Sequence, residues 1–450
     1  MNTRIFYRLL AVNIFTCLLL LSGCGNPSPE DVEAAQELTK LRKIVAEQAK
    51  QIEELKKQVE SYAIEKIKEL EGSVTTDDNG FATEITWYCS NDDLKLLQTL
   101  SKLQILSLTN PEITDDALKH IAKVDSLQRL LLKNTGVGDA GMQHLQGLSE
   151  LFYIDLELTN IREEGLKHLS SLPKLRVLRL VKTKVTDKGL EYLKNAKTLQ
   201  AIDLRETNSF SDAGVSHLAG LTNMVDLKLY GEQVTNESMK AISNMKKLRI
   251  LALQVTKVDD EGMKLVAGLT NLEHVILTDS PVGDSAMEVL AGLPKMARLE
   301  LRKTGVGDEG CKSIGKLSNL QLLDLRQTGV SGVGLSELIG LKKLVNLNLW
   351  NSISIDDDAL EPIGKMTQLK ELSVAKASVG DAGLAHLSGL TQLEKLDISE
   401  HSLSISDDGL MALKPLQALR ELNISNLAFV SDEAVDELKT ALPNCTIVGP

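Results

Sequence analysis

From Leu103 to the end of the chain, one apolar pattern returns about every 24 residues, and this periodicity constrains the fold more than any other feature. In each unit two leucine-type residues stand two positions apart, as Leu130 and Leu132 do, which is typical of a short strand. Apolar residues three positions apart follow, such as Leu145 and Leu148, and indicate a helical turn. One unit cannot bury its apolar face alone, so the units must stack into a continuous core. Successive units begin at Leu103, Leu127, Leu151, Leu175, Leu199, Met224, Leu248, Leu272, Met296, Leu320, Leu344, Leu369, Leu393, Leu419 and Cys445.

The pattern resembles the leucine-rich repeat family, in which each unit reads L-x-x-L-x-L-x-x-N/C-x-L over about 20–29 residues. The chain departs from it at the Asn/Cys position, where Thr or Ser usually stands. A hydroxyl there can bond the backbone of the turn that leaves the strand, as Asn or Cys does in relatives. The residues at this position include Thr135, Thr159, Thr183, Thr207, Thr256, Ser280, Thr304, Thr328 and Ser352. The resemblance implies an α/β solenoid over residues 103–450, with a curved parallel sheet on the concave side and short helices on the convex side.

Residues 1–23 have the features of a secretory signal peptide. Arg4 and Arg8 precede an apolar run from Leu9 to Leu21, which is too short to span a bilayer. The run ends in Leu-Ser-Gly-Cys at residues 21–24, which resembles a bacterial lipobox. That resemblance implies that Cys24 becomes the lipid-modified first residue of the mature protein, carrying fatty acids such as palmitate. The alternative is an ordinary signal peptide with a chance cysteine.

A lipid on Cys24 would anchor the mature chain to a membrane. Several acyl chains on one residue hold a protein stably, whereas a single chain does not. Residues 24–28 would then form a lipidated linker. Gly25 follows the cysteine, and the lack of an acidic residue there argues against retention in the inner membrane. We therefore expect a bacterial cell envelope location, in the outer membrane or facing the periplasm or the cell surface.

Residues 29–71 carry the charge and apolar spacing of a coiled-coil helix. The a positions are Leu38, Val45, Ile52 and Val59, and the d positions are Leu41, Gln48, Leu55 and Tyr62. β-Branched residues at a with Leu at d favour a parallel two-stranded coiled coil. After Tyr62 the apolar positions shift to Ala63, Ile67 and Leu70. Two alternatives remain, a parallel homodimer through residues 38–62 and a single amphipathic helix packed on the first turn of the solenoid.

Residues 72–102 are expected to join the helix to the repeats. Residues 72–80 are polar and contain a turn signal at Thr75–Gly80, so they predict a linker. A strand over Ala82–Cys89 and a helix over Asp93–Leu100 follow. We interpret this half-unit as an N-terminal cap of the solenoid core, because terminal repeats must cover the exposed end.

An acidic residue recurs about twelve positions after most unit starts, namely at Asp115, Asp139, Glu163, Asp187, Asp212, Asp260, Asp284, Asp308, Asp357, Asp381, Asp407 and Asp432. A ladder of carboxylates suggests calcium, but no second acid recurs nearby to complete an oxygen cage. We interpret each acid as a cap for the free N–H groups of its own helix. His120, His144 and His168 also fall in register, but helices 8–10 Å apart separate them too far for one metal ion. No metal or other cofactor is therefore expected.

The remaining cysteines do not predict a disulfide framework. Cys89, Cys311 and Cys445 stand near the start, middle and end of the array. Strands advance about 4.8 Å per unit, so each pair lies far beyond the ~7 Å that a disulfide allows. We expect three packed thiols.

The residues between the buried leucines of each strand face the concave surface, and they vary from unit to unit. From Asp155 to Lys228 their charges alternate in sign, which predicts ion pairs between neighbouring strands and a structural role. A candidate partner-binding surface follows, because aromatic residues beside arginines dominate binding hot spots. It comprises Tyr230, His274, Arg298, Arg302, Lys303, Arg326 and Trp350. The alternative is that Glu300 and Asp324 simply neutralise these arginines.

No nucleophile motif, metal set or phosphate-binding glycine loop accompanies the repeats. The formal charge of −12 and the export signal disfavour nucleic acid as a partner. We therefore expect a non-catalytic, lipid-anchored envelope protein whose concave face binds a protein partner. The alternative is a structural scaffold or tether that acts through coiled-coil oligomerisation without a specific ligand. An undetected hydrolase is a third hypothesis.

Overall fold

The structure is a computed structural model that describes residues 29–400 and 405–449. These residues divide into two compact units, with the boundary between Tyr62 and Ala63. The predicted signal peptide (residues 1–23), the lipidation site Cys24 and the linker to residue 28 lie outside the described residues. Within the described ranges, no helix is both long and apolar enough to cross a membrane.

A single long helix, α2 (Pro29–Glu69), carries the first unit, as the sequence predicts. Pro29 suits the first helical turn, and no glycine or further proline interrupts the helix. Up to Tyr62 most of its heptad-position side chains face solvent, with exposed fractions from 45% for Ile52 to 60% for Leu55, whereas Leu38 and Val45 are half-buried. This part of α2 therefore presents an apolar stripe and buries little of it.

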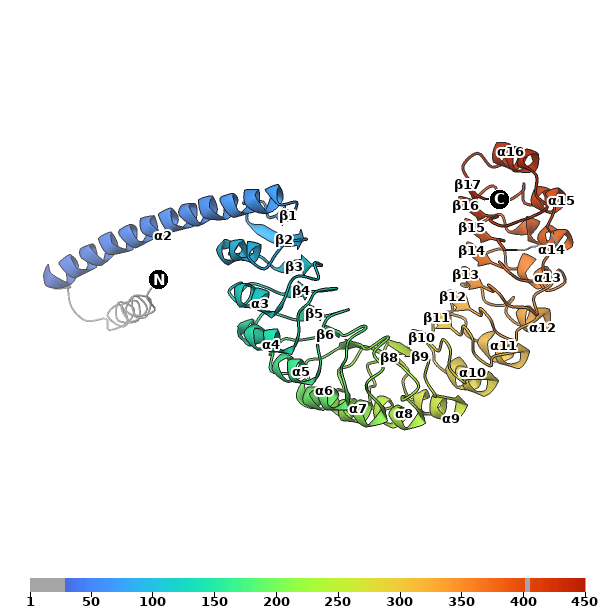
Figure 1. The fold of residues 1–450 in the computed structure, drawn as a ribbon, viewed down its shortest axis with the longest axis horizontal. Coiled ribbons are helices and arrows are strands. Elements are labelled where there is room, and N and C mark those ends of the chain that lie inside the picture. The colour runs from blue at the N-terminus through green and yellow to red at the C-terminus, as the bar shows by residue number, and fades with distance from the viewer. Residues whose placement is uncertain (1–28, 401–404, 450) are drawn as a thin grey trace. The chain divides into compact units, whose positions relative to one another are not determined.

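The second unit is a solenoid built on one sheet of 17 strands. Each strand from β2 to β17 pairs in parallel with the next along the chain, so equivalent residues of successive units stand side by side. The strands line the inner side of the arc and the helices its outer side (Figure 1), which confirms the predicted fold class. The strands are β1 (Ser73–Thr76), β2 (Ala82–Trp87), β3 (Ile105–Leu108), β4 (Arg129–Leu131), β5 (Tyr153–Asp155), β6 (Val177–Arg179), β7 (Ala201–Asp203), β8 (Asp226–Tyr230), β9 (Ile250–Gln254), β10 (His274–Ile276), β11 (Arg298–Glu300), β12 (Leu322–Asp324), β13 (Asn346–Asn348), β14 (Glu371–Ser373), β15 (Lys395–Asp397), β16 (Glu421–Asn423) and β17 (Thr446–Val448).

Short helices return the chain from one strand to the next on the convex side. The α-helices are α3 (Asp115–Ile121), α4 (Asp139–Met142), α5 (Glu163–Leu169), α6 (Asp187–Tyr192), α7 (Asp212–His217), α8 (Asn236–Ile242), α9 (Asp260–Met263), α10 (Asp284–Ala291), α11 (Asp308–Ile314), α12 (Gly332–Ser336), α13 (Leu360–Gly364), α14 (Asp381–His386), α15 (Asp407–Met411) and α16 (Asp432–Ala441). The 3₁₀ turns are η1 (Asp93–Thr99), η2 (Gln143–Gly147), η3 (Leu193–Asn195), η4 (Leu218–Gly220), η5 (Lys264–Val266) and η6 (Leu387–Gly389).

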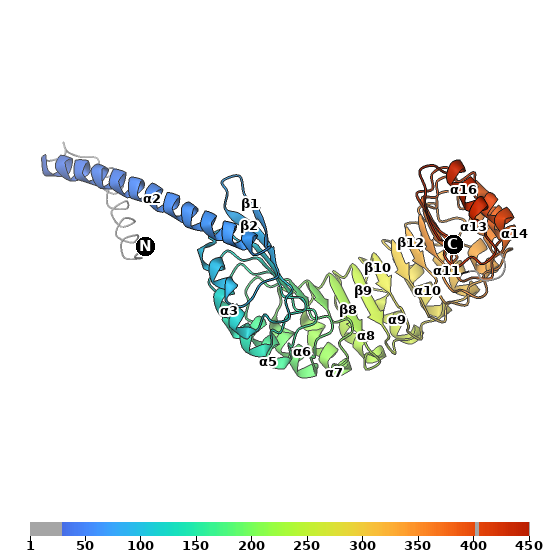
Figure 2. The same ribbon diagram turned by 45° about the horizontal axis from the view of Figure 1, so that its top comes forward.

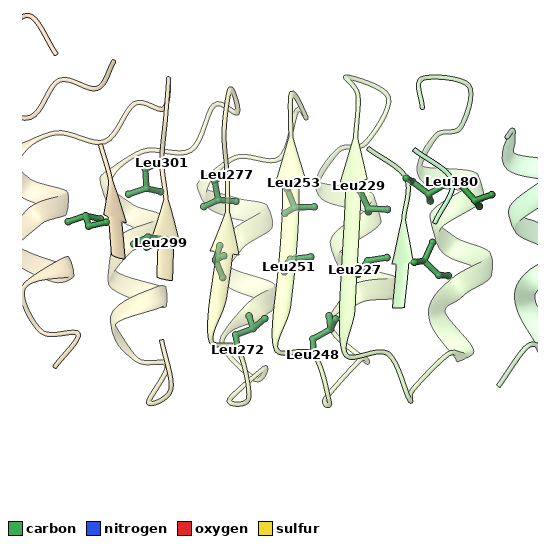
Figure 3. Close-up of a cluster of buried hydrophobic side chains, with 14 of the residues drawn as sticks. Leu180, Leu227, Leu229, Leu248, Leu251, Leu253, Leu272, Leu277, Leu299 and Leu301 are labelled. Carbon is green, nitrogen blue, oxygen red and sulfur yellow. The ribbon is translucent and has the colours of Figure 1, made fainter. Parts of the chain in front are cut away.

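Leucines from the strands fill the space between the sheet and the helices. Leu227 and Leu229 of β8 and Leu251 and Leu253 of β9 are fully buried and stack in rows (Figure 3). Burying one such side chain is worth about 1.5–3 kcal/mol, and every unit repeats the same contacts. The residues between these leucines are consequently held at fixed positions on the concave face.

The predicted hydroxyl ladder stabilises the turn after many of the strands, although Thr256 Oγ1 is buried without a hydrogen-bond partner. The Oγ1 atoms of Thr135 and Thr304 donate to the carbonyls of Leu132 and Leu301, both at 2.7 Å. The residue before the hydroxyl is left-handed in many units, with a φ of 54° at Lys303. These bonds confirm that Thr replaces the Asn or Cys of the family pattern without loss of the turn.

The acidic ladder lies in or just before the first turn of the helices, as predicted, but its role differs from the prediction. Asp187 Oδ1 accepts hydrogen bonds from the backbone N–H groups of Ser211 and Gly214 in the next unit, at 2.6 and 3.0 Å. Asp308 accepts in the same way from Ser331 and Gly334. The interpretation that each acid caps its own helix is therefore wrong, because the carboxylate reaches the start of the following helix. The ladder links neighbouring units.

Small residues make room for this link. A Cβ atom at Gly141 would lie 2.6 Å from Asp115 Oδ1, and one at Gly310 would lie 2.6 Å from Asp284 Oδ1. Real Cβ atoms do not approach that closely, so glycine permits the carboxylate of the preceding unit to reach the helix start.

The N-terminal cap is larger than the sequence indicates. Residues 73–76, expected to be linker, form β1, which pairs antiparallel with β2. The predicted turn is present, with Asp77 Oδ1 accepting from the N–H groups of Asn79 and Phe81. Ile64 and Ile67 in the last turns of α2 are buried in the solenoid core, which explains the shift in apolar positions after Tyr62. The end of α2 therefore covers the open end of the array.

The three described cysteines are free thiols, as predicted. Cys89 and Cys311 are buried, and burial raises the pKa of each thiol to about 12. Cys445 is half-buried near the last strand. At neutral pH the first two thiols are protonated and behave as packing residues.

Candidate protein-binding surface

The concave face presents alternate side chains of consecutive strands in columns. His274 of β10 stands beside Arg298 of β11, which stands beside Leu322 of β12. Figure 2 shows strands from β8 to β12 side by side along this surface. The parallel register therefore decides which side chains can interact across units.

The paired segment, which we define as Asp155, Arg179, Asp203 and Arg205, neutralises its own charge. Arg179 Nη1 lies 2.9 Å from Asp155 Oδ2, and its Nε lies 3.8 Å from Asp203 Oδ2. Arg205 donates from Nε and Nη2 to Asp203 at 2.9 and 2.8 Å. The predicted structural role of these alternating charges is therefore confirmed. Lys228 pairs with Asp226 of its own strand, at 3.0 Å, which the alternation alone did not predict.

A charged partner lowers the pKa of one acid of the paired segment in spite of its burial, whereas burial raises the pKa of the other. Burial raises the pKa of Asp155 above its usual value despite the nearby Arg179. Burial also opposes ionisation of Asp203, but the hydrogen bonds and charge of Arg205 outweigh it and lower the pKa of Asp203. Asp203 is thus the better stabilised anion.

An open hollow of about 510 Å³ lies further along the concave face, and we call it the basic hollow. It brings together four of the seven predicted surface residues, Arg302, Lys303, Arg326 and Trp350. Tyr230, His274 and Arg298 are not part of its lining. The complete lining is Arg302, Lys303, Arg326, Gln327, Asn348, Trp350, Ser373 and Asp397.

The basic side chains of the hollow differ in how they are neutralised. Arg326 donates to Asp324 from Nε at 2.9 Å and forms a tight ion pair with it, which raises the pKa of Arg326. Lys303 Nζ lies 3.4 Å from Asp279. Arg302 has no ion pair with any described residue, and its Nε atom is buried without a hydrogen-bond partner. Lys376 Nζ stands 5.4 Å from the centre of the Trp350 ring.

Glu300 stands beside the hollow but is bound elsewhere. Its Oε1 atom lies 2.7 Å from His274 Nε2, and this hydrogen bond lowers the pKa of Glu300. Arg298, on the same strand, is exposed and has no ion pair within the described ranges. The expectation that Glu300 and Asp324 neutralise the arginines therefore holds for Arg326 only.

A family model described as a leucine-rich repeat region matches residues 90–311 and 280–445, which together span most of the chain. The chain belongs to the leucine-rich repeat family. None of the curated proteins compared with it matches.

Two solved structures are similar to this leucine-rich repeat protein. An internalin from Listeria monocytogenes has a TM-score of 0.54 at 20% identity, over 71% of this chain and 87% of that one. A leucine-rich repeat protein from Leptospira interrogans has a TM-score of 0.56 at 19% identity, over 84% of this chain and 93% of that one. At these identities the likeness shows the fold. Leucine-rich repeat solenoids present extended concave surfaces, so the fold suggests protein–protein interaction.

Four lining residues of the hollow were not among the predicted site residues. Asn348, Ser373 and Asp397 each stand between the two buried apolar residues of their unit. They pair in register one after another, beginning beside Asp324. Gln327 holds the same left-handed position after its strand as Lys303 does, with a φ of 54° at both. The register of the leucine-rich repeats could have placed all four beside Arg302 and Trp350.

A second hollow of about 200 Å³ adjoins the first through Asn348, Ser373 and Asp397. Its charged members are satisfied internally, since Lys395 pairs with Glu421 and Asn346 bonds Glu371. In the part of the chain that the structure describes, no group of three His, Cys, Asp or Glu residues is arranged to hold a metal ion.

Proposed function

We propose that this leucine-rich repeat protein is a non-catalytic, lipid-anchored component of a bacterial cell envelope whose concave face binds a protein partner. The observation that carries the proposal is the basic hollow, where two arginines, a lysine and a tryptophan converge on one surface. Tryptophan and arginine are enriched in binding hot spots because they combine a large contact area with directed hydrogen bonds. The repeat fold supports it, since leucine-rich repeat proteins generally act as scaffolds for other proteins.

Capture of a partner from native envelope extracts tests this function. The bait is the protein beside a variant with Arg302, Arg326 and Trp350 changed to alanine. We expect a protein that the wild type retains and the variant loses, because the variant removes the hot-spot side chains.

A charge-matched control variant changes Arg176, Arg420 and Tyr88, which are exposed outside the hollow, to alanine. It removes two arginines and one aromatic residue, as the test variant does. Equal retention by all three baits, or retention by none, would contradict concave-face recognition at the hollow.

The anchor follows from the predicted lipobox, and a labelled fatty acid tests it. We expect radioactive palmitate to label the wild type in bacterial cells and not a Cys24→Ser variant, because the thiol carries the lipid. The variant should also move from the membrane to the soluble fraction. Equal labelling of both proteins would exclude Cys24 as the attachment site.

The second candidate, a structural scaffold or tether, is favoured by the exposed apolar stripe of α2. Leu55 and Val59 are 60% and 51% exposed, and residues 38–62 keep the heptad of a parallel dimer. About 40 helical residues span roughly 60 Å, so a paired α2 would form a long stalk. Such a stalk can also serve the first function by raising avidity.

Cysteine cross-linking tests the parallel dimer. In register, position 55 of one helix faces position 55 of its partner, whereas position 57 points outward. We therefore expect Leu55→Cys to form a disulfide-linked dimer in air and Lys57→Cys to remain monomeric. Equal cross-linking at both positions, or at neither, would remove the support for oligomerisation through α2.

A further inference from the structure

Two buried polar atoms without a hydrogen-bond partner belong to side chains that line the basic hollow. They are Nε of Arg302 and Oε1 of Gln327. The described residues contain five such side-chain atoms in total, so two of the five lie at this one place. One is a donor and the other an acceptor. Buried polar groups are normally paired, and a ligand that satisfies both atoms is therefore favoured.

The charge of Arg302 has no ion-pair partner among the described residues, because the acid two residues before it bonds another side chain. Arg326 is bound by Asp324, the last residue of β12, which stands two residues before it. The corresponding acid for Arg302 is Glu300, but Glu300 bonds His274 of the neighbouring strand at 2.7 Å. Arg302 thus offers a guanidinium group with free donors at the wall of the hollow.

The unpaired atoms define the chemistry of the ligand. The guanidinium fork matches a carboxylate, which accepts two parallel hydrogen bonds. Gln327 Oε1 accepts a hydrogen bond, which a peptide N–H supplies and an unprotonated sulfate ion does not. The Trp350 ring adds an apolar wall for a neighbouring side chain. A volume of about 510 Å³ suits a short segment, since small-ligand pockets span about 300–1,000 Å³.

We propose that the basic hollow binds an acidic peptide segment of the partner. One carboxylate pairs with Arg302, a peptide N–H donates to Gln327, and an adjacent apolar side chain packs on Trp350. This inference rests on the proposed function, because it names the chemistry of what the concave face recognises.

A random heptapeptide library displayed on phage tests the inference on the full-length protein in detergent micelles. We expect selection to enrich peptides with Asp or Glu next to an aromatic or aliphatic residue. A selected peptide with blocked termini and a fluorescent label then gives affinities by anisotropy. Arg302→Gln should weaken its binding at least about tenfold, because a charge-assisted bidentate pair is lost. Gln327→Leu should weaken it about threefold, as loss of a neutral hydrogen bond does.

Arg298→Gln is the matched control, because it removes the same charge from β11, four residues before Arg302, and lies outside the hollow. It should change the affinity less than about threefold, the scale of a surface electrostatic effect. Equal weakening by Arg298→Gln and Arg302→Gln would overturn the inference, as would enrichment of peptides without acidic residues. Displacement of the peptide by millimolar inorganic phosphate or by vesicles of anionic lipid would replace it with a simple anion or membrane site.

The outcomes also separate the two proposals. If the alanine variant at Arg302, Arg326 and Trp350 loses the envelope partner while the library yields no acidic peptide, partner recognition stands and its acidic chemistry is excluded. If the partner is retained by every variant, the proposed function itself fails.

Discussion

Arg205 and Arg302 hold equivalent places on the concave face, yet their surroundings differ. Each follows an acid by two residues at the end of its strand. In the paired segment Asp203 accepts two hydrogen bonds from Arg205, at 2.9 and 2.8 Å. At the basic hollow the corresponding acid, Glu300, bonds His274 instead. An acid two residues away therefore does not neutralise an arginine when the neighbouring strand offers that acid another partner.

The first prediction compares how much the acids that link neighbouring units contribute to stability in the two regions. Asp187 under the paired segment and Asp308 near the hollow each accept from two backbone N–H groups and a serine hydroxyl of the next unit. Asp187→Ala and Asp308→Ala should each lower the free energy of unfolding by about 2–3 kcal/mol, since buried donors lose a charged acceptor. Urea unfolding measures both.

Asp432→Ala is the control for this pair, because Asp432 begins α16, the last helix of the described residues, so no later helix start lies beside its carboxylate there. It should change the free energy of unfolding by less than about 0.5 kcal/mol. A large difference between Asp187→Ala and Asp308→Ala would mean that the two regions differ in their scaffold as well as in their concave side chains.

The second prediction compares the two arginines directly. Arg205→Gln should cost about 1–2 kcal/mol of unfolding free energy, because it removes the charged partner of a buried carboxylate. Arg302→Gln should cost less than about 0.5 kcal/mol, since no carboxylate depends on it. Shifts in the urea midpoint measure the contrast. Equal costs at the two positions would show that Arg302 has a structural partner. The two arginines would then not differ in their contribution to stability.

The regular part of this architecture could be predicted from the sequence, because it depends on local spacing. Leu130 and Leu132 alternate as a strand requires, and Thr135 bonds the turn as its position suggests. The same spacing placed Arg302 and Trp350 on one surface. Strand β1 was missed because Ser73, Thr75 and Thr76 show no alternation of apolar residues, and its pairing with β2 arises from the hairpin alone.

The remaining features depend on which of two possible partners an acid bonds, one nearby in the sequence and one in a neighbouring unit. The carboxylate of Asp187 could bond its own helix or the next one, and only the stagger of the units decides. Likewise Glu300 can reach either Arg302, two residues further along the chain, or His274 on the neighbouring strand β10. The sequence contains both partners of each acid, so spacing alone cannot rank them.

The third prediction removes the partner that holds Glu300. In a His274→Leu variant Glu300 should turn toward Arg302 and form the pair seen between Asp324 and Arg326. The affinity for the acidic peptide should then fall about fivefold, which corresponds to about 1 kcal/mol. Adding Glu300→Gln should restore it, because the competing carboxylate is gone. A loss that persists in the double variant would place His274 in direct contact with the peptide and would end its role as a positioning residue.

The smallest effect concerns the pH dependence of Glu300. Its pKa is lowered in the folded protein, first of all by the hydrogen bond from His274, so the ionised form favours folding. The resulting stability is present above the ordinary pKa of 4.5 and disappears as the pH falls through the lowered value. Glu300→Gln should therefore cost roughly 0.5 kcal/mol at neutral pH, as a partly exposed pair does, and nothing in stronger acid. Urea midpoints of both proteins across this range measure the difference. A cost that grows as the pH falls would mean that Glu300 is protonated in the fold, and Arg302 would then lack a charged neighbour for another reason.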